Sequence, residues 1–282
     1  MAEIVAGLGI SHIPTLGAIM RERPNDPDTA IVYDTFEPVR SWIAEMELDA
    51  VVVIYNDHAA EFSLEMLPTF AIGAADSYRP ADEGYGRSAV PTVPGDAELS
   101  WHIIDSVIPS GFDLVVCQSL DVDHGVTVPL TVVFGPAEDW PVPVVPIAVN
   151  VVQQPTPSAQ RCFDLGVALG DALRSYSGSA KRIGVIGTGG MSHQLQGARA
   201  GHINEEFDRH FLSSIVDQPA DLTRLTNAEY LTLAGSEGAE LVMWLVMRGA
   251  LSESVTADIT GYHIPVSSTA AGLVALRNQP AA

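Results

Sequence analysis

The sequence predicts an α/β protein that folds as one domain. Short apolar runs rich in Val and Ile alternate along the chain with segments of helical periodicity. The 282 residues are 47% hydrophobic and 17% charged, which allows a sizeable core and excludes disordered, collagen-like and coiled-coil proteins. Neither an internal repeat nor a low-complexity linker interrupts the chain, so we expect residues 1–282 to form a single domain.

The first half of the chain alternates strand and helix patterns. Two apolar runs, Ile4–Ile10 and Ala50–Tyr55, predict buried strands. Between them, Pro38–Met46 predicts a short helix whose apolar residues share one face, namely Val39, Trp42, Ile43 and Met46. Further along, Ala97–Ile108 predicts a helix and Leu114–Cys117 a strand.

The second half continues this alternation. Val142–Val152 predicts a strand interrupted by prolines, and Cys162–Tyr176 predicts an amphipathic helix. Arg182–Ile186 predicts a strand that runs into the glycine turn GTGG. Gly201–Val216 predicts a polar helix, whereas Ala239–Met247 is apolar almost all round and predicts a buried one.

One long segment, Asp57–Gly95, has no strong period. It contains four prolines, at positions 68, 80, 91 and 94. We therefore expect a long, ordered and functional loop region there.

The charge of the chain excludes some partners. Lys and Arg total 14 against 35 Asp and Glu, a formal net charge of −21. A surface this acidic repels phosphate groups, so we expect neither nucleic acid nor an anionic membrane as a partner. Lys181 is the single lysine and lies in an ordinary polar stretch, which argues against Schiff-base chemistry.

Several features indicate a cytoplasmic protein. The chain opens with Met1-Ala2-Glu3, which is acidic where a secretory signal is basic. Its apolar stretches, such as Leu241–Met247, are far shorter than the roughly 18–20 residues of a membrane span. Cys117 and Cys162 lie in apolar surroundings, and we expect both to be buried, reduced thiols.

Three histidines follow three expected strands. His12 comes after Ile4–Ile10, His58 after Ala50–Tyr55, and His193 after the turn that ends Arg182–Ile186. A single histidine of this kind is more often structural, but ligands of α/β proteins gather at the carboxyl ends of strands. We therefore expect these three side chains to converge on a site. Three other histidines lie in helical stretches with polar neighbours and are expected to be solvated or capping: His102, His202 and His210.

Glu240 supplies a carboxylate at the start of the expected buried helix. A charge there needs a partner or a metal, although a glutamate in a first turn is also favoured by the helix dipole alone. Two histidines and one carboxylate suit a non-haem Fe(II) oxygenase, and the same ligand types suit a Zn²⁺ hydrolase. HExxH and GxSxG motifs are absent, and the glycine turn matches GxGxxG only in part.

Five segments, in this order over nearly the whole chain, resemble the class III extradiol ring-cleavage dioxygenases. Within that family the likeness is greatest to the catalytic beta chains of protocatechuate 4,5-dioxygenases. The segments are Gly9–Pro14, Tyr55–His58, Asp121–Gly125, Gly187–Gly197 and Gly235–Gly249.

The resemblance implies a role for each matched residue. His12, His58 and Glu240 would bind Fe(II), and His193 would be the catalytic acid–base. The other implied residues contact the substrate: Asn56 and His124 hydrogen-bond the catechol hydroxyls or bound oxygen, Ser267 lies near the substrate carboxylate, and Ala18 forms a pocket wall. His263 has no role in this set and is expected to be structural.

The implied protein is a single-domain α/β enzyme with a central mixed sheet flanked by helices. It cleaves a catechol carboxylic acid with O₂ beside the diol. Protocatechuate, giving 4-carboxy-2-hydroxymuconate semialdehyde, is the first substrate expected, and gallate or 3-O-methylgallate is the alternative. Enzymes of this type imply a small alpha subunit, supplied separately, or an oligomer that closes the site. A zinc hydrolase with the same ligands and a non-catalytic binding module are the readings from other classes.

Overall fold

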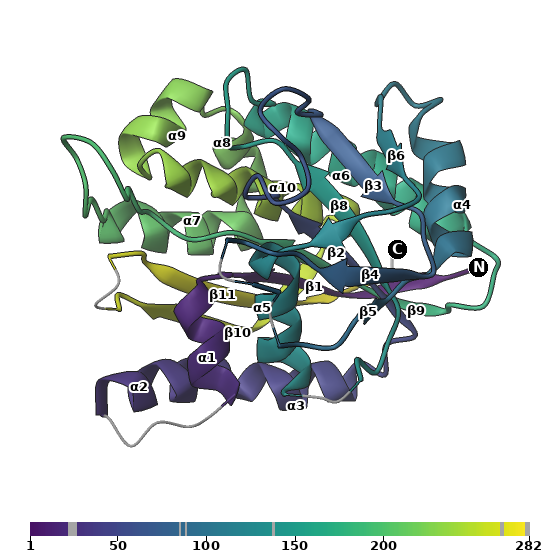
Figure 1. Cartoon of the computed structure of the whole chain (residues 1–282), viewed down its shortest axis with the longest axis horizontal. Coiled ribbons are helices and arrows are strands. Elements are labelled where there is room, and N and C mark those ends of the chain that lie inside the picture. Colours follow the sequence, from purple (N-terminus) through teal and green to yellow (C-terminus); the bar gives the residue numbers. More distant parts are fainter. Residues whose placement is uncertain (22–26, 85, 88, 137–138, 266–267, 280–282) are drawn as a thin grey trace.

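A large mixed sheet forms the centre of the molecule (Figure 1). The structure is a computed structural model, and it describes residues 1–21, 27–84, 86–87, 89–136, 139–265 and 268–279. Within these ranges, eight strands pair in the order β10-β11-β1-β9-β2-β8-β3-β6. Their bounds are β1 Glu3–Ile10, β2 Ala50–Tyr55, β3 Phe70–Gly73, β6 Val115–Cys117, β8 Val144–Val149, β9 Arg182–Thr188, β10 Val255–His263 and β11 Ala271–Asn278.

The four inner strands β1, β9, β2 and β8 run parallel, so their carboxyl ends lie at one edge of the sheet. In the register, Ile10 of β1 pairs with Thr188 of β9, and Ile54 of β2 pairs with Gly187. The neighbouring strands β1, β9 and β2 therefore end at the same level of the sheet. The segments that carry His12, His193 and His58 start from these ends.

Helices cover both faces of the sheet (Figure 1). One face carries α1 Pro14–Arg21, α2 Pro27–Phe36, α3 Pro38–Glu45 and α5 His124–Phe134. The other carries α4 Ala97–Val107, α6 Ala159–Ser175, α7 Glu205–Asp217, α8 Pro219–Thr223, α9 Asn227–Leu233, the 3₁₀ helix η1 Glu237–Leu241 and α10 Val242–Ala250. Each face of the sheet thus has its own apolar core, which confirms the predicted mixed α/β fold.

Most expected elements are present, with shifted ends. The helix expected from Cys162 begins at Ala159, because Ser158 accepts a hydrogen bond from the backbone N–H of Arg161 and caps it. The helix expected from Gly201 begins only at Glu205, after the cap formed by Asn204. The buried helix expected over 239–247 is split into η1 and α10.

The expectation of a long loop over Asp57–Gly95 is wrong. This region contains β3 of the main sheet and two strands of a small second sheet, β4 Ser77–Pro80 and β5 Val93–Pro94, to which β7 Asp121–Val122 adds from further along the chain. These strands have four residues or fewer, and β3 is buried throughout, so each run is too short for its pattern to distinguish it from a loop.

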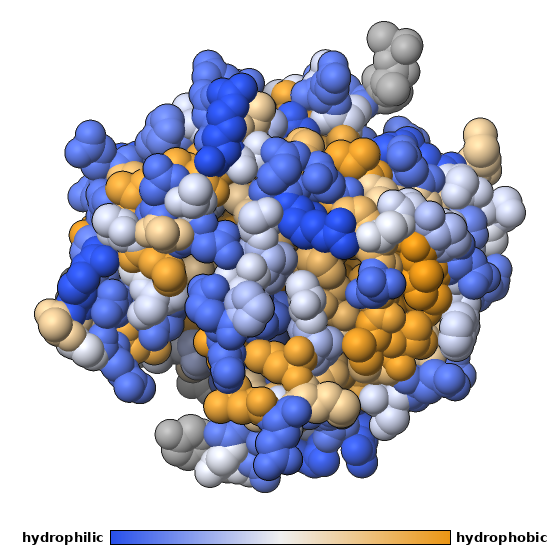
Figure 2. Space-filling view, turned by 90° about the horizontal axis from the view of Figure 1, so that it is seen from above, coloured by the Kyte–Doolittle hydropathy of each residue, from blue (hydrophilic) through white to orange (hydrophobic). Residues whose placement is uncertain are grey.

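The face shown in Figure 2 is mostly hydrophilic, and one of the two cysteines is buried as expected. Figure 2 shows a largely hydrophilic face with apolar side chains gathered in a patch on one side. Cys162 is buried and free, whereas Cys117, on an outer strand, is free but only half-buried. Every helix in the described ranges is too short or too polar to cross a bilayer.

Candidate active site

Three histidines meet at the carboxyl edge of the sheet. His12 follows β1 and His58 follows β2, and their ring centroids lie 5.1 Å apart. His124, the first residue of α5, stacks on His58 at 4.0 Å. One ring nitrogen of each histidine lies within 4.8 Å of the others, so the three form a candidate metal site.

Glu240 joins this cluster from η1. Its carboxylate is buried, with Oε2 at 3.2 Å from His12 Nε2 and Oε1 at 3.6 Å from His58 Nε2. The backbone N–H of Gly190, after β9, donates a hydrogen bond to Oε2 at 2.6 Å. The carboxylate therefore faces both imidazoles, so a cation placed between them would contact all three side chains. The structure thus brings His12, His58 and Glu240 together as expected.

In His12 and His58, the ring nitrogen that does not face Glu240 has a hydrogen-bonding partner of its own. His58 Nδ1 lies 2.8 Å from Asp123 Oδ2, and His12 Nδ1 lies 3.0 Å from Thr188 Oγ1. A carboxylate only accepts, so Nδ1 of His58 carries a proton and Nε2 is the atom left for a metal. Outer partners of this kind orient metal-binding histidines.

The electrostatics favour deprotonated carboxylates. Burial alone would raise the pKa of Glu240, but the charges and hydrogen bonds of His12 and His58 hold it well below its usual value. The hydrogen bond from His58 similarly lowers the pKa of Asp123 to about 2. Burial lowers the pKa of His12, although the neighbouring Glu240 carboxylate opposes this shift. For His58, the two carboxylates outweigh burial and raise the pKa to about 10.

This donor set fits a divalent cation. Two Nε2 atoms and a carboxylate converge, and each imidazole is held from behind. Asn56 Nδ2 lies 3.0 Å from His58 Nε2, and Asn56 Oδ1 is buried without a hydrogen-bond partner in the described part of the chain. The Asn56 amide therefore lies at the cluster, within hydrogen-bond distance of the ring nitrogen of His58 that faces Glu240. Three protein ligands would leave coordination positions for a substrate.

His193 lies on the other side of Gly190. A Cβ atom on Gly190 would come within 2.6 Å of His193 Cε1, while the N–H of the same residue contacts Glu240. His193 is 5% exposed, and its Nδ1 lies 2.8 Å from the carbonyl oxygen of Met191. Because a carbonyl only accepts, Nδ1 carries a proton and a neutral His193 has its lone pair on Nε2.

A known protein family matches the sequence of this chain over most of its length. Residues 6–273 match the family described as "Catalytic LigB subunit of aromatic ring-opening dioxygenase". The chain belongs to the LigB family. This family comprises class III extradiol dioxygenases, as the five motif segments implied.

Individual relatives agree with this assignment. A gallate dioxygenase from Pseudomonas putida is 42% identical over 199 residues, 71% of this chain and 58% of the relative. A 2,3-dihydroxyphenylpropionate/2,3-dihydroxicinnamic acid 1,2-dioxygenase from Klebsiella pneumoniae is 32% identical over 66% of this chain and 55% of its own length. The chain thus matches little more than half the length of these curated relatives. Neither of these two relatives is named a protocatechuate 4,5-dioxygenase, so the greater likeness to the beta chains of those enzymes stays a prediction.

The fold has a counterpart among solved structures. The crystal structure of an uncharacterized protein from Escherichia coli K12 superposes with a TM-score of 0.62 and covers 96% of this chain and 99% of its own. Its sequence is 17% identical, so the likeness concerns the fold of this LigB-family chain alone.

Of the four residues expected to contact the substrate, two lie beside His58. Asn56 is buried beside His58, and His124 stacks on the same ring. Ala18 is exposed on α1, a helix that packs against α5. Ser267 lies outside the described residues, so its implied contact with a carboxylate stays a prediction.

Other histidines of this LigB-family chain have local roles. His102 Nε2 lies 2.9 Å from the carbonyl oxygen of Ala172, and His202 Nε2 lies 3.1 Å from that of Leu233. His263 ends β10 opposite Ala271. The contacts of His102 and His202 with backbone carbonyls agree with the capping role expected of them, and the structural role expected of His263 stays a prediction.

Three polar partners in the site were not foreseen. Asp123 and Thr188 lie inside the quoted motifs, next to His124 and within the glycine turn, yet we assigned them no role. Glu83 accepts from the backbone N–H of His124 at 3.0 Å and forms a close ion pair with its Nδ1. The position of Asp123 next to His124 and that of Thr188 within the glycine turn were usable signals, whereas Glu83, 41 residues from His124, had none.

Proposed function

We propose that this chain is an Fe(II)-dependent extradiol dioxygenase that cleaves the ring of a catechol carboxylic acid with O₂. The convergence of His12 Nε2, His58 Nε2 and the Glu240 carboxylate beside His193 is the observation that carries the proposal. Membership of the LigB family supports the same chemistry. Residues 1–282 would act as one catalytic domain, since the central sheet takes strands from Glu3 to Asn278.

The substrate proposal is narrowed by the relatives. The 42% identity to a gallate dioxygenase favours gallate, which we had placed second, over protocatechuate. These acids differ by one ring substituent, and pocket selectivity of that size amounts to roughly 1–3 kcal/mol. Gallate is therefore the first substrate to assay, followed by protocatechuate and 3-O-methylgallate.

Each residue has a defined task in this proposal. Bound Fe(II) would offer open positions to the two catechol oxygens and supply the redox chemistry toward O₂. His12, His58 and Glu240 would bind the metal, with Asp123 and Thr188 orienting the two imidazoles. Nε2 of His193, left unprotonated by the bond from Nδ1 to Met191, would accept a hydroxyl proton and later return it. Asn56 and His124 would hydrogen-bond the hydroxyl groups.

Partners and location belong to the same proposal. Large apolar side chains are exposed close to the site residues in sequence: Leu64 and Met66 after His58, and Leu195 after His193. Their exposure supports a covering chain, either a small alpha subunit or a second copy. The two free thiols support a reducing, cytoplasmic location.

The test is anaerobic reconstitution of the chain with Fe(II), followed by oxygen-electrode measurement with each catechol acid. We expect one O₂ consumed per substrate and a ring-fission absorption band, and neither with a His12→Ala variant. A zinc hydrolase uses the same ligand types. Tightly bound Zn²⁺, with no O₂ uptake from any catechol acid, would favour the hydrolase and overturn this proposal.

A further inference from the structure

A buried carboxylate lies behind the turn that carries His193. Asp208, in the first turn of α7, is 0% exposed. Its Oδ1 accepts a hydrogen bond from the backbone N–H of Ser192 at 2.8 Å. Its Oδ2 accepts from Ser192 Oγ at 2.6 Å and from Tyr262 Oη at 2.8 Å. Both oxygens are therefore used, and two of the three donors belong to the residue directly before His193.

The same serine is held from further directions. Ser192 Oγ accepts from the backbone N–H of Asn204, the cap of α7, at 2.7 Å. The carbonyl of Ser192 accepts from the N–H of Ala270 at 3.3 Å, just before β11. Ser192 is thus fixed between α7, β10 and the start of β11, and Asp208 is the charged centre of that arrangement.

The direction of the His193 ring depends on this backbone. Its Nδ1 bonds to the carbonyl of Met191, two residues earlier, so the ring is oriented by its own turn and not by a distant side chain. The backbone N–H of His193 donates to the carbonyl oxygen of Ala234 at 2.7 Å. A shift of the peptide at Ser192 would move the Met191 carbonyl and the ring together.

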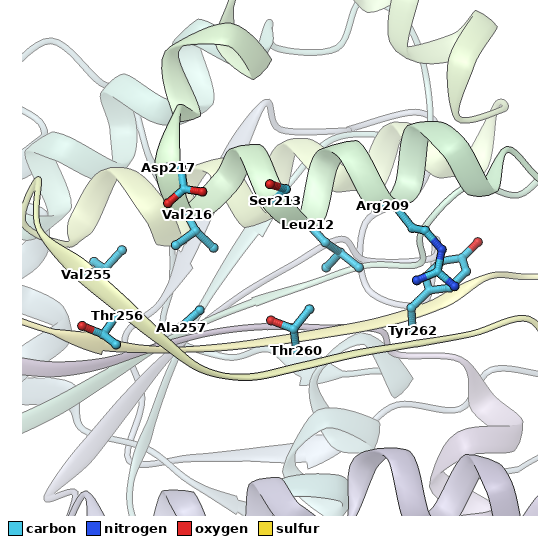
Figure 3. A pocket seen from close by; sticks show the side chains of 10 residues that line it. All are labelled: Arg209, Leu212, Ser213, Val216, Asp217, Val255, Thr256, Ala257, Thr260 and Tyr262. Carbon is cyan, nitrogen blue, oxygen red and sulfur yellow. The ribbon is translucent and has the colours of Figure 1, made fainter.

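The network reaches the surface through Tyr262. Figure 3 shows Tyr262 and Arg209 side by side at one end of a pocket of about 630 Å³ between α7 and β10. The Arg209 guanidinium lies 4.9 Å from the centre of the Tyr262 ring. The outer donor to Asp208 is therefore itself held in place by packing.

We propose that Asp208 is a positioning residue for His193: by binding both donors of Ser192 it fixes the turn that directs Nε2 of His193 toward the substrate. The inference rests on the proposed acid–base function of His193. Small errors in the placement of a catalytic group lower turnover more than substrate binding.

The decisive variant is Asp208→Asn. It keeps the shape of the side chain but places an amide NH₂ group, which only donates, opposite the hydroxyl donors of Ser192 and Tyr262. Asp258→Asn is the matched control, because Asp258 lies on the same strand as Tyr262 and accepts from Trp42 and Arg277, away from the His193 turn. We expect Asp208→Asn to lower kcat by about 10–100-fold, with KM and iron content within about twofold of wild type. Asp258→Asn should leave kcat, KM and iron content within about twofold of wild type.

A second readout does not depend on turnover. In the metal-free chain labelled with ¹⁵N-histidine, the His193 signals are assigned by their absence in His193→Gln. We expect wild type to show one tautomer, protonated on Nδ1, and Asp208→Asn to show averaged tautomers. Ser192→Ala, which removes one hydroxyl donor, should lower kcat by about 3–10-fold and serves if Asp208→Asn fails to fold.

The outcomes separate the two proposals. Unchanged kcat and an unchanged His193 tautomer in folded Asp208→Asn would overturn the positioning role, as would unchanged values in Ser192→Ala if Asp208→Asn is unfolded. Absence of O₂ uptake by wild type with every catechol acid would overturn the proposed function. In that case the tautomer measurement still decides whether Asp208 positions His193.

Discussion

Asp123 binds His58 twice, since its Oδ2 accepts from both the backbone N–H at 2.7 Å and the ring Nδ1 at 2.8 Å. One carboxylate oxygen thereby fixes the position of the His58 ring and holds a proton on its Nδ1, which leaves Nε2 for the proposed metal. Asp123 is fully buried at the start of α5, where its Oδ1 accepts from the N–H of Gly125. The arrangement links the end of β2 to the helix that carries His124.

Replacing Asp123 by Asn should therefore weaken metal binding. An amide accepts at only one end, so either the donors of His58 or the N–H of Gly125 lose their acceptor, and the negative charge beside the protonated Nδ1 is lost in both cases. We expect affinity for Fe(II) to fall about 10–100-fold in an anaerobic titration. Asp121→Asn is the control, because Asp121 pairs with Arg79 and Arg87 on the surface. Equal affinities of Asp123→Asn and wild type would contradict the orienting role.

Metal binding should release a proton from His58. The two carboxylates raise the pKa of His58 from 6.5 to about 10 in the metal-free chain, so near pH 7 the ring is charged. A metal needs the neutral ring, and we expect apparent affinity to rise about tenfold per pH unit between pH 6.5 and 9. Calorimetry in buffers of different ionisation enthalpy measures the released proton directly. Affinity independent of pH in this range would contradict the binding of metal by a His58 that is charged in the metal-free chain.

The same pKa predicts how stability varies with pH. A raised pKa in the folded state stabilises the metal-free protein below pH 6.5, and this contribution is lost as pH rises toward 10. The metal-loaded protein holds His58 neutral and should lack this loss. We therefore expect the difference in Tm between loaded and metal-free protein to grow from pH 6.5 to 9. Thermal unfolding followed by circular dichroism at three pH values checks this, and a constant difference would contradict it.

Glu240→Ala and His193→Ala should separate metal binding from turnover. Glu240→Ala removes the carboxylate shared by His12 and His58, and we expect the iron content after reconstitution to fall below about a tenth of wild type. His193→Ala leaves the three ligands in place and should retain full iron while kcat falls about 10²–10⁴-fold. Iron analysis and oxygen uptake on the same samples test both. Full iron in Glu240→Ala, or near-normal turnover in His193→Ala, would remove that residue from its role.

The sequence predicted which side chains meet at this edge of the sheet, because each follows a recognisable strand or opens a buried helix. His12, His58 and His193 lie within five residues of the ends of β1, β2 and β9. That these three strands are neighbours is a property of the sheet order, which local pattern does not contain. The resemblance to the extradiol dioxygenases therefore supplied what periodicity alone left open.

The parts that were missed share a physical cause. β10 is an outer strand in which no residue is fully buried, and β3 has four residues, so neither has a clear period. Glu83 and Asp208 act across the fold, 41 and 16 residues from the partners they bind. Contacts of this kind depend on tertiary packing, and nothing in the local sequence marks either acid.

Gly190 provides the sharpest steric test of the site. Its N–H contacts Glu240, and a Cβ atom there would lie 2.6 Å from His193 Cε1 and 2.9 Å from Nδ1. In Gly190→Ala the His193 ring must therefore move, while the backbone bond to Glu240 can persist. We expect kcat to fall about 10–100-fold with iron content unchanged. In a His193→Ala background the added methyl has no ring to displace, so Gly190→Ala should cause no further loss. A similar loss in both backgrounds would mean that the methyl group acts through Glu240 or the fold instead of through His193.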